Sequence, residues 1–330
     1  MKERIENVLE GRQLSTEGAR ALMSEALSEP INPSLVAALL TALRIKGVTV
    51  DELDGFCQAL MELAMPLDLG TNDCIDVCGT GGDNKGAFNI STTTAFILAA
   101  AGYKVAKHGN YAVSSSCGSS NVLEALGISL ECDPNKLRKR LASANVCFLH
   151  APLFHPAMKR VAPIRKELGF RTIFNMLGPL VNPARPAVQV NGVYDRETLR
   201  LYSYLLKRRG NRFATLCTLD GYDEVTLTAP LLVASHRGEF ELSPADFGLP
   251  SVHQGDIQGG RNLEESATIV RRILQGKGSE AHELVTSASA GLAMWIQEQQ
   301  GTLREHVARA REIVRSGAGE KILERSIKEL

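Results

Sequence analysis

The sequence lacks an excess of either charge and any long hydrophobic run. Lys and Arg together number 37 among its 330 residues, and Asp and Glu together also number 37. A nucleic-acid-binding domain normally carries net positive charge, so this balance removes the usual reason to expect nucleic acid as a partner. No apolar stretch approaches the roughly 20 residues that a membrane-spanning helix needs. The first residues, MKERIENVLEGRQ, lack the apolar core of a signal peptide. We therefore expect a cytoplasmic protein without a membrane or nucleic-acid partner.

The cysteines do not form the pattern of a disulfide framework or of a zinc site. Their number, seven, is odd, and they are scattered along the chain without the paired spacing of zinc ligands. Free cysteine is among the most frequently buried residue types. We therefore expect buried, unpaired thiols and a reducing compartment.

Two common nucleotide-binding motifs are also missing, although one stretch has the composition of a phosphate site. Neither G-x-G-x-x-G nor G-x-x-x-x-G-K-[ST] occurs, which argues against a dinucleotide-binding turn and against a P-loop. Residues 76–94, DVCGTGGDNKGAFNISTTT, instead continue an apolar run typical of a buried strand. They place four glycines within eight residues before the start of a predicted helix.

Such a turn can hold a phosphate group. Glycine lets backbone N–H groups turn toward a ligand, and a helix start offers unpaired N–H donors with a partial positive charge. Asn89, Ser91 and Thr92 can cap the helix or supply polar atoms to a phosphate or a metal. Asp83 would repel a phosphate unless it meets a sugar hydroxyl or a cation, so it indicates a phosphorylated sugar with a divalent metal. A purely structural turn is the alternative interpretation.

The order of predicted elements indicates an α/β protein with a helical part. Residues 1–65 read as amphipathic helices that start at Ser15 or Thr16, at Asn32-Pro33 and at a capping box from Thr49. From residue 73, strands alternate with helices, which predicts a mostly parallel central sheet with ligands at the carboxyl ends of its strands. The predicted strands are 73–78, 103–106, 146–150, 188–194, 213–219 and a short one from Asp223 to Thr228, followed by a hairpin turning at 236–238.

This order also predicts two domains. We expect a small all-helical domain of residues 1–70, joined by helices from about 156–187, and a larger α/β domain of residues 71–155 and 188–330. The short helices of the first domain must bury their apolar faces on something. A second copy of the chain is a reasonable candidate, so we expect a homodimer through the N-terminal helical domain.

A second polar loop, KHGNYAVSSSCGSSN at 107–121, follows the second predicted strand. It combines Lys107 with amide side chains and five serines. Hydroxyl groups at this density seldom fill a core, so the loop is predicted to contact phosphate or pyrophosphate. His108 has two interpretations, a structural histidine and a catalytic one.

Charged residues further along the chain offer sites for a metal and for a second substrate. Adjacent acids such as Asp223 and Glu224 are usually solvated surface residues. A magnesium ion bound to a pyrophosphate, however, would use one or two carboxylates together with substrate oxygens. Arg165 is either a surface arginine or a group that grips the carboxylate of a second substrate with its planar guanidinium.

Several of these motifs resemble, in the same order, the anthranilate phosphoribosyltransferases. The similarity is carried by residues 78–92, KHGN at 107–110, the run 118–126, residues 165–183 and DGYDE at 220–224, and by TALRIKG at 41–47 in the helical part. It spans nearly the whole chain. The resemblance implies a nucleoside-phosphorylase-like fold and a magnesium-dependent homodimer in tryptophan biosynthesis. It also implies phosphoribosyl pyrophosphate and anthranilate as substrates.

The resemblance implies a role for each matching residue. Lys107, Asp223 and Glu224 would act electrostatically in catalysis, with no general base assigned. The magnesium ligands would be Ser91, Asp223 and Glu224, and the anthranilate-binding residues Gly79, Asn110 and Arg165. The residues that bind phosphoribosyl pyrophosphate would be Gly79, Gly82, Asp83, Asn89, Ile90, Ser91, Thr92, Lys107 and Ser119.

The chain departs from the family pattern at four positions. The family usually has a hydroxyl residue, an arginine, a lysine and an aspartate where this chain has Ala87, Tyr111, Ser116 and Asn121. Two other functions are therefore kept as alternatives: a pyrimidine nucleoside phosphorylase, which shares the fold, and a nucleic-acid-binding paralogue without catalysis. The retained GTGGD, NIST and DE motifs and the neutral net charge favour the transferase.

Overall fold

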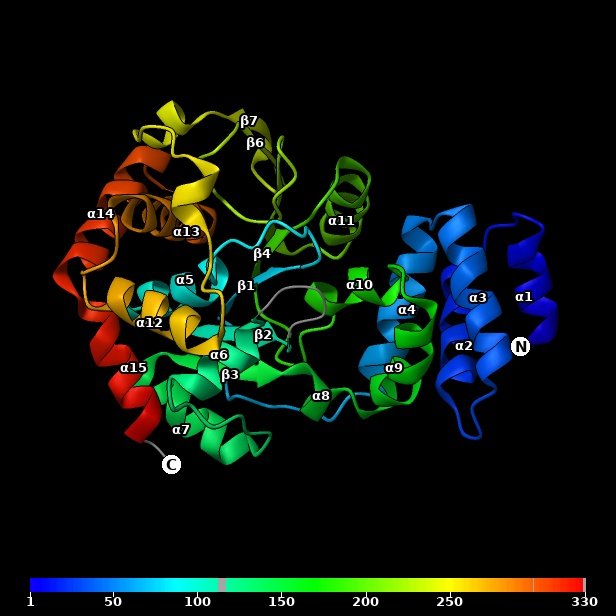
Figure 1. Cartoon of the computed structure of the whole chain (residues 1–330). Helices are drawn as coiled ribbons and strands as arrows, with labels where there is room; N and C mark the ends of the chain where they lie inside the picture. Colours follow the sequence, from blue (N-terminus) through cyan, green and yellow to red (C-terminus); the bar gives the residue numbers. More distant parts are fainter. Residues whose placement is uncertain (112–116, 299, 329–330) are drawn as a thin grey trace. The chain divides into compact units, whose positions relative to one another are not determined.

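The structure divides into two compact units. It is a computed structural model and describes residues 1–111, 117–298 and 300–328. Unit 1 comprises Met1–Leu67 with Ala151–Pro183, and unit 2 comprises Asp68–His150 with Ala184–Leu330. Figure 1 shows unit 1 as a group of helices and unit 2 as helices around a sheet, which confirms the predicted fold class.

Unit 1 is built from helices whose starts follow the capping signals in the sequence. The side chains of Ser15 and Asn32 cap the second and third helices, and Thr49 forms the predicted capping box. These predictions are confirmed. The helices of unit 1 are α1 (Lys2–Leu9), α2 (Thr16–Leu27), α3 (Pro33–Lys46), α4 (Val50–Glu62), α8 (Ala151–Phe154), α9 (Pro156–Leu168), α10 (Phe174–Leu177) and the 3-10 helix η1 (Gly178–Leu180).

A buried carboxylate fastens the N-terminal helices to one another. Glu52 is 0% exposed and accepts hydrogen bonds from the backbone N–H groups of Leu14 (2.9 Å) and Thr49 (2.9 Å). Lys46 Nζ at the end of α3 donates to the same carboxylate at 2.8 Å. Because an unpaired buried charge is strongly destabilising, these partners fix α4 against the end of α3 and the loop before α2.

Unit 2 is organised around a seven-stranded sheet in the order β3-β2-β1-β4-β5-β6-β7. The first five strands in this order, β3, β2, β1, β4 and β5, run parallel to one another. Strand β6 is antiparallel to β5, and β7 is antiparallel to β6. The prediction of a mostly parallel sheet is therefore confirmed. The carboxyl ends of the parallel strands meet at one edge, where such sheets bind ligands. The strands are β1 (Ile75–Gly79), β2 (Val105–Gly109), β3 (Val146–His150), β4 (Val188–Gly192), β5 (Arg212–Thr218), β6 (Leu231–Ser235) and β7 (Gly238–Leu242).

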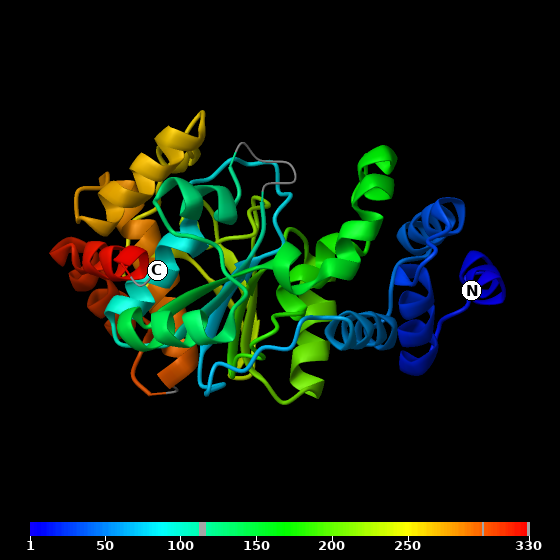
Figure 2. The same ribbon diagram turned by 90° about the horizontal axis from the view of Figure 1, so that it is seen from below.

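Helices cover both faces of this sheet. On one face, α5 (Ile90–Ala100) and α13 (Glu280–Glu298) share a hydrophobic core with Val77 and Val188. On the other, α11 (Arg196–Arg208) packs on β5 (Figure 2). Tyr202 is among the buried residues of α11. None of the described helices is long and apolar enough to cross a membrane. The other helices of unit 2 are α6 (Ser119–Ala125), α7 (Pro134–Ala144), α12 (Leu263–Leu274), α14 (Leu303–Ser316), α15 (Ala318–Lys328), η2 (Pro244–Phe247) and η3 (Gln254–Ile257).

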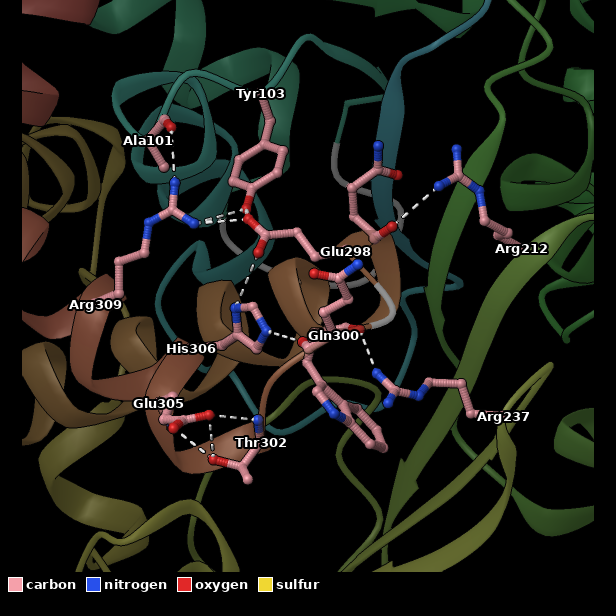
Figure 3. Close-up of polar contacts among 12 residues, drawn as sticks. Ala101, Tyr103, Arg212, Arg237, Glu298, Gln300, Thr302, Glu305, His306 and Arg309 are labelled. Atoms are coloured by element: carbon pink, nitrogen blue, oxygen red, sulfur yellow. Dashed lines mark hydrogen bonds and ion pairs between the residues drawn. The ribbon is translucent and has the colours of Figure 1, made fainter.

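Two arginines from the sheet hold the C-terminal end of α13. Arg212 Nη1 donates to the carbonyl oxygen of Gln297 at 3.0 Å, and Arg237 Nη1 donates to that of Trp295 at 2.7 Å (Figure 3). The Arg237 guanidinium also lies 4.0 Å from the centre of the Trp295 ring. Positive charge at the C-terminal end of a helix satisfies its last carbonyls and complements its dipole. The longest helix of the unit is thereby fixed to the sheet at the end away from the strand carboxyl ends.

One predicted strand is shorter than the observed one. The second strand was expected to end at residue 106, but β2 continues to Gly109 and pairs along its length with β3. Lys107 and His108 therefore lie on a strand and not in the polar loop. Both are buried, at 3% and 2% exposure, which a loop position would not have predicted.

Another predicted strand is wrong. Residues 223–228 form no strand, so Asp223 and Glu224 lie in an irregular segment between β5 and β6. The N–H of Thr218 donates to Tyr222 O at 3.1 Å and closes a tight turn at the end of β5. Leu227 then has a φ of 60°, a left-handed conformation that a strand does not contain. The predicted hairpin after this segment is confirmed as β6 and β7.

The structure contains the seven cysteines as thiols that are not joined in disulfides, as predicted. Five are buried, Cys78 is half-buried and Cys132 is exposed, so the expectation of burial holds for most of them. Burial raises the pKa of Cys78 to about 12 and that of Cys74 to about 11. Thiols with raised pKa values are poor nucleophiles, which agrees with a packing role for these two residues.

Candidate active site

The ends of β1 and β4 leave a space without side chains, and Asp223 occupies it. Gly79 ends β1 and pairs with Gly192 at the end of β4. A Cβ atom on Gly79 would lie 2.5 Å from Asp223 Oδ2, and one on Gly192 would lie 1.6 Å from the Asp223 carbonyl oxygen. Both distances are shorter than any van der Waals contact, so both positions require glycine. Asp223 is thereby brought to the start of the glycine-rich turn.

The glycine-rich turn binds the Asp223 side chain directly. The N–H of Gly81 donates to Asp223 Oδ2 at 2.6 Å, and the negative charge of Asp83 is close enough to repel that of Asp223. Gly81 and Gly82 have φ values of 67° and 78°, which glycine adopts without strain. Two of the predicted site residues, Gly82 and Asp83, therefore lie beside Asp223.

Burial raises the pKa of both adjacent acids. The pKa of Asp223 is well above its ordinary value because the side chain is buried and because the charges of Glu224 and Asp83 repel its own. Burial raises the pKa of Glu224 to about 7, although Lys107 and Ser91 act in the opposite direction. Closely spaced carboxylates that resist ionisation form an environment that favours a bound cation.

Lys107 is the cationic group beside these acids. Its ammonium donates to the carbonyl oxygen of Val77 at 2.5 Å and to Ser91 Oγ at 3.3 Å. The N–H of Ser91 donates to Glu224 Oε1 at 3.3 Å. The structure therefore brings together Lys107, Ser91 and Glu224, which the sequence predicted as site residues from three separate motifs.

The start of α5 differs from the prediction. Asn89 occupies the N-cap position, but its side chain makes no capping bond and donates instead to Cys117 O at 3.4 Å. Ile90 is 0% exposed in the core, and Thr92 is 1% exposed. Within the described part of the chain, the Thr92 hydroxyl has no hydrogen-bond partner. Contact of Ile90 or Thr92 with a ligand at this edge would therefore involve the backbone.

The two described ends of the 107–121 loop meet each other. Residues 112–116 lie outside the described residues, and the departure at Ser116 is among them. The carbonyl oxygen of Asn110 accepts hydrogen bonds from Ser119 Oγ (3.2 Å) and from the N–H of Ser120 (3.1 Å). Asn110, predicted to bind anthranilate, and Ser119, predicted to bind phosphoribosyl pyrophosphate, are thus neighbours.

The other three departures from the family pattern have defined surroundings. Ala87 is half-buried and belongs to an isolated antiparallel bridge. The Tyr111 hydroxyl donates to Glu124 Oε1 at 3.1 Å. Asn121 Oδ1 accepts a hydrogen bond from the N–H of Gly118 at the start of α6 (3.1 Å). Tyr111 and Asn121 therefore stabilise the ends of the polar loop.

Arg165 lies in unit 1, on α9, and is half-buried. The carbon atom of its guanidinium group lies 5.3 Å from the centre of the Phe174 ring, within the range of a cation–π contact. The ring restricts the orientation of the planar guanidinium, which is the group that binds a carboxylate with two parallel hydrogen bonds.

Sequence reasoning missed Gly192. The glycine was placed inside a predicted strand, and its contact with Asp223 comes from a segment thirty residues further along the chain. A signal was nevertheless present, because a glycine within a strand often marks the close approach of another backbone.

The acid pair fits a magnesium ion that is shared with a pyrophosphate. Asp223 and Glu224 offer the hard oxygen ligands that magnesium prefers, and Ser91 offers a hydroxyl. Among the described residues, no group of three or more His, Cys, Asp or Glu side chains is arranged to hold a metal ion. Magnesium in phosphoryl sites commonly uses one or two carboxylates together with phosphate oxygens, and this site can supply that protein share.

We predict that Glu224→Gln stabilises the protein at high pH in the absence of divalent ions. The pKa of Glu224 rises from 4.5 to about 7 on folding, so the folded state holds its proton more tightly than the unfolded chain. The stability that this contributes is complete below pH 4.5 and is lost as the pH rises through about 7. Urea unfolding at pH 8 should show a gain of about 2 kcal/mol for the variant, shrinking toward zero near pH 5.

The exposed residue Glu312 provides a control for this measurement. Glu312→Gln removes the same charge from a solvated helix position and should leave the unfolding free energy nearly unchanged at both pH values. A Glu224→Gln variant that is less stable than the parent protein at pH 8 would contradict the raised pKa of Glu224.

Comparison with known proteins gives the same family over both units. The family model described as "Glycosyl transferase family, a/b domain" matches residues 71–320, and the model described as "Glycosyl transferase family, helical bundle domain" matches residues 2–64. An anthranilate phosphoribosyltransferase from Flavobacterium johnsoniae is 46% identical over 325 residues, which cover 98% of each chain. One from Bacteroides fragilis is 39% identical over 327 residues, which cover 99% of each chain.

Solved structures agree with these sequence relatives. The crystal structure of anthranilate phosphoribosyltransferase from Thermus thermophilus superposes with a TM-score of 0.93 at 37% identity, covering 99% of this chain and 98% of that one. The enzyme from Saccharomyces cerevisiae in complex with PRPP and Mg superposes with a TM-score of 0.92 at 25% identity, covering 99% and 96%. The chain therefore belongs to the anthranilate phosphoribosyltransferase family.

Proposed function

We propose that the protein transfers the phosphoribosyl group of phosphoribosyl pyrophosphate (PRPP) to the amine of anthranilate and releases pyrophosphate, a step of tryptophan biosynthesis. The observation that carries the proposal is the acid pair, buried Asp223 and half-buried Glu224, held against the Gly79–Gly81 turn beside Lys107. The enzymes to which the chain is 39% and 46% identical over nearly their whole length support the same activity. They do not support a nucleoside phosphorylase or a nucleic-acid-binding paralogue.

The residues at the strand ends divide the work of binding PRPP. The glycine-rich turn contributes Gly79, Gly82 and Asp83. The N–H groups of Gly82 and Asp83 face the phosphate groups, because those of Thr80 and Gly81 donate to Gly192 O and Asp223 Oδ2. The Asp83 carboxylate binds a sugar hydroxyl or the cation. The other PRPP-binding residues are Asn89, Ile90, Ser91, Thr92, Lys107 and Ser119. We assign magnesium to Ser91, Asp223 and Glu224, whose oxygen atoms are the ligand type that this ion prefers. A relative from yeast has been solved in complex with PRPP and Mg.

The reaction exchanges one bond at the anomeric carbon. The neutral amine nitrogen of anthranilate forms a bond to that carbon, the bond to the pyrophosphate oxygen breaks, and its electrons leave with pyrophosphate. Magnesium, when bound, neutralises part of this negative charge. Lys107 stabilises the departing pyrophosphate from a buried position, and the backbone donors of the turn hold it in line. An aromatic amine is nucleophilic before it loses a proton, so no side chain is assigned as a general base. The nitrogen releases its extra proton, to water or to the departing pyrophosphate, after the bond to carbon has formed.

Loss of anthranilate fluorescence tests this activity. The purified protein with PRPP, magnesium and anthranilate should consume anthranilate and release an equal amount of pyrophosphate. Omitting PRPP or adding a chelator should stop both signals. Release of a free base from a pyrimidine nucleoside with phosphate, in the absence of anthranilate consumption, would favour the phosphorylase instead.

We further propose that Arg165 binds the carboxylate of anthranilate, with Gly79 and Asn110 as its other protein contacts. Relatives from yeast have been crystallised with 4-fluoroanthranilate, which supports recognition of this acid by the family. Arg165→Ala should raise KM for anthranilate roughly 10- to 100-fold, because a charged double hydrogen bond is lost. KM for PRPP should change far less. Equal changes in the two KM values would contradict the assignment.

A homodimer through the helical domain is also proposed, as is a cytoplasmic location. Unit 1 exposes large apolar side chains, with Ile45 82% and Leu9 62% exposed. Exposed apolar side chains of this size support an interface between copies of the chain. Light scattering should give twice the mass of the chain, and Ile45→Asp should shift the population toward the monomer. A monomeric parent protein at micromolar concentration would refute the dimer.

A further inference from the structure

Residues 82–88, which we call the glycine-rich arm, lead from the glycine-rich turn to α5. A segment far along the chain pairs with this arm. The N–H of Phe88 donates to Ile257 O at 2.9 Å, and the N–H of Gly259 donates to Gly86 O at 2.7 Å. Between these bonds, Ala87 and Gln258 form an isolated antiparallel bridge. Residues 254–259, which we call the clasp, thus hold the arm by its backbone.

The same segment is bonded to the loop that carries the two acids. Gln254 Nε2 donates to Asp220 Oδ2 at 3.0 Å, and Gln258 Nε2 donates to Gln254 O at 3.0 Å within the segment itself. Asp220 and Tyr222 flank the turn that leads into Asp223. The clasp therefore makes contact with both halves of the proposed PRPP site, which lie more than a hundred residues apart in the sequence.

The clasp itself is anchored and closely fitted. Ile257 is 0% exposed and belongs to the hydrophobic core of unit 2. A Cβ atom on Gly259 would lie 3.1 Å from Ala87 O and 3.2 Å from Gly86 O, so the backbones approach closely there. Gly255 has open space around it. The close fit is thus confined to the part of the clasp that faces the glycine-rich arm.

The glycine-rich arm needs such a support. Gly82, Asn84 and Gly86 all have positive φ values, and a segment with these residues has many conformations of similar energy in isolation. Lys85 lies between these residues, and its ammonium is 5.4 Å from the centre of the Tyr222 ring. It thereby contacts residues 220–228, the loop that carries Asp223 and Glu224 and that we call the acid loop. Bonds from a fixed segment reduce the set of conformations that the arm samples before a ligand binds.

We propose that the clasp positions the glycine-rich turn and the acid loop relative to each other, with Gln254 and Gly259 as its positioning residues. The proposal rests on the proposed function, since it assigns the clasp to the PRPP and magnesium site. Neither residue is assigned contact with a substrate. Their replacement should therefore weaken the binding of PRPP and magnesium without changing how anthranilate is bound.

Two pairs of variants separate positioning from general structure. Gly259→Ala adds a methyl group against the arm, and Gly255→Ala adds the same group in open space. Gln254→Ala removes the bond to Asp220, and Gln275→Ala removes a similar amide bond, to Glu320 at 3.3 Å, elsewhere in unit 2. Each variant is compared with the parent protein in steady-state kinetics, in magnesium titrations and in thermal unfolding.

Gly259→Ala and Gln254→Ala should each raise KM for PRPP and the half-saturating magnesium concentration about five-fold. A change of this size corresponds to the free energy of one ordinary hydrogen bond. KM for anthranilate should stay within about two-fold, as should all values for Gly255→Ala and Gln275→Ala. A parallel rise of both KM values, or equal effects of Gly255→Ala and Gly259→Ala, would overturn the proposal.

Hydrogen exchange tests the clasp without any substrate. In the parent protein, peptides that contain Phe88 and Gly259 should exchange slowly, and Gly259→Ala should accelerate both by at least about five-fold. Unchanged exchange in that variant would contradict the clasp. If the parent protein fails to consume anthranilate while exchange behaves as expected, the proposed function fails but the clasp does not.

Discussion

The double substitution Asp223→Asn with Glu224→Gln is expected to lower kcat/KM for PRPP roughly 100- to 1,000-fold at limiting magnesium. Both new side chains have nearly the size of the old ones. Their amide oxygens can still accept the hydrogen bonds from the N–H groups of Gly81 and Ser91. The variant thus removes two negative charges while the local structure is kept.

The physical reason for this large effect is the position of the pair, with Asp223 buried and Glu224 half-buried. Water and salt screen such charges much less than charges on the open surface, so a cation held there interacts strongly with both carboxylates. With the carboxylates replaced by amides, the excess negative charge of the leaving pyrophosphate is met by Lys107 and the backbone donors alone. The loss should appear in the magnesium dependence as well as in the rate.

Glu312 and Glu324, both exposed on helices of unit 2, supply a control with the same change in net charge. Glu312→Gln with Glu324→Gln should leave kcat/KM within about two-fold of the parent value. Near-normal turnover of the Asp223→Asn, Glu224→Gln variant at limiting magnesium would remove the metal-binding role of the acid pair.

Replacing Lys107 by glutamine is the second change with a large expected effect, a fall in kcat of roughly 100-fold. The glutamine amide can still donate a hydrogen bond toward Val77 O, which accepts from the lysine at 2.5 Å in the parent protein. The substitution therefore tests the positive charge more than the hydrogen bond. Because Lys107 is 3% exposed, its charge acts on the leaving group with little solvent screening.

Steady-state kinetics with Lys104→Gln as the control checks this prediction. Lys104 is exposed and precedes β2, so it lies at the opposite end of the strand from the site. Circular dichroism and thermal unfolding show whether the Lys107→Gln protein is folded. A folded variant with kcat within about three-fold of the parent value would show that the charge of Lys107 is not needed.

The features that the sequence predicted well are those set by local interactions. Helix starts at Ser15, Asn32 and Thr49 depend on side chains that bond to backbone N–H groups three residues away. Turns with glycine and the apolar runs of buried strands are similarly local. The parallel sheet followed from the order of such elements, because parallel neighbours require a crossover connection between them.

The features that were missed depend on distant contacts. Residues 225–228, Val-Thr-Leu-Thr, have a high preference for strands, but the acid loop bends there because Asp223 packs on Gly79 and Gly192. Nothing local in residues 254–259 indicates that they pair with the glycine-rich arm. The burial of Lys107 likewise follows from the pairing of β2 with its neighbours on both sides.

The family resemblance supplied the roles, and the geometry supplied a physical reason for several of them. Ser91, Lys107 and Glu224 come from separate segments and meet in one cluster. The departures at Tyr111 and Asn121 place neutral side chains where the family has charged ones, and both side chains bond within the protein. The same kinetic assays measure the effect of these two residues on PRPP binding.

A crystal structure with PRPP and manganese in place of magnesium tests the central claim most directly. The account predicts anomalous density for the metal about 2.1 Å from oxygens of Asp223, Glu224 and the pyrophosphate, with the pyrophosphate against the turn from Gly79 to Asp83. Metal and pyrophosphate bound at another edge of the sheet, with the two acids unoccupied, would contradict it.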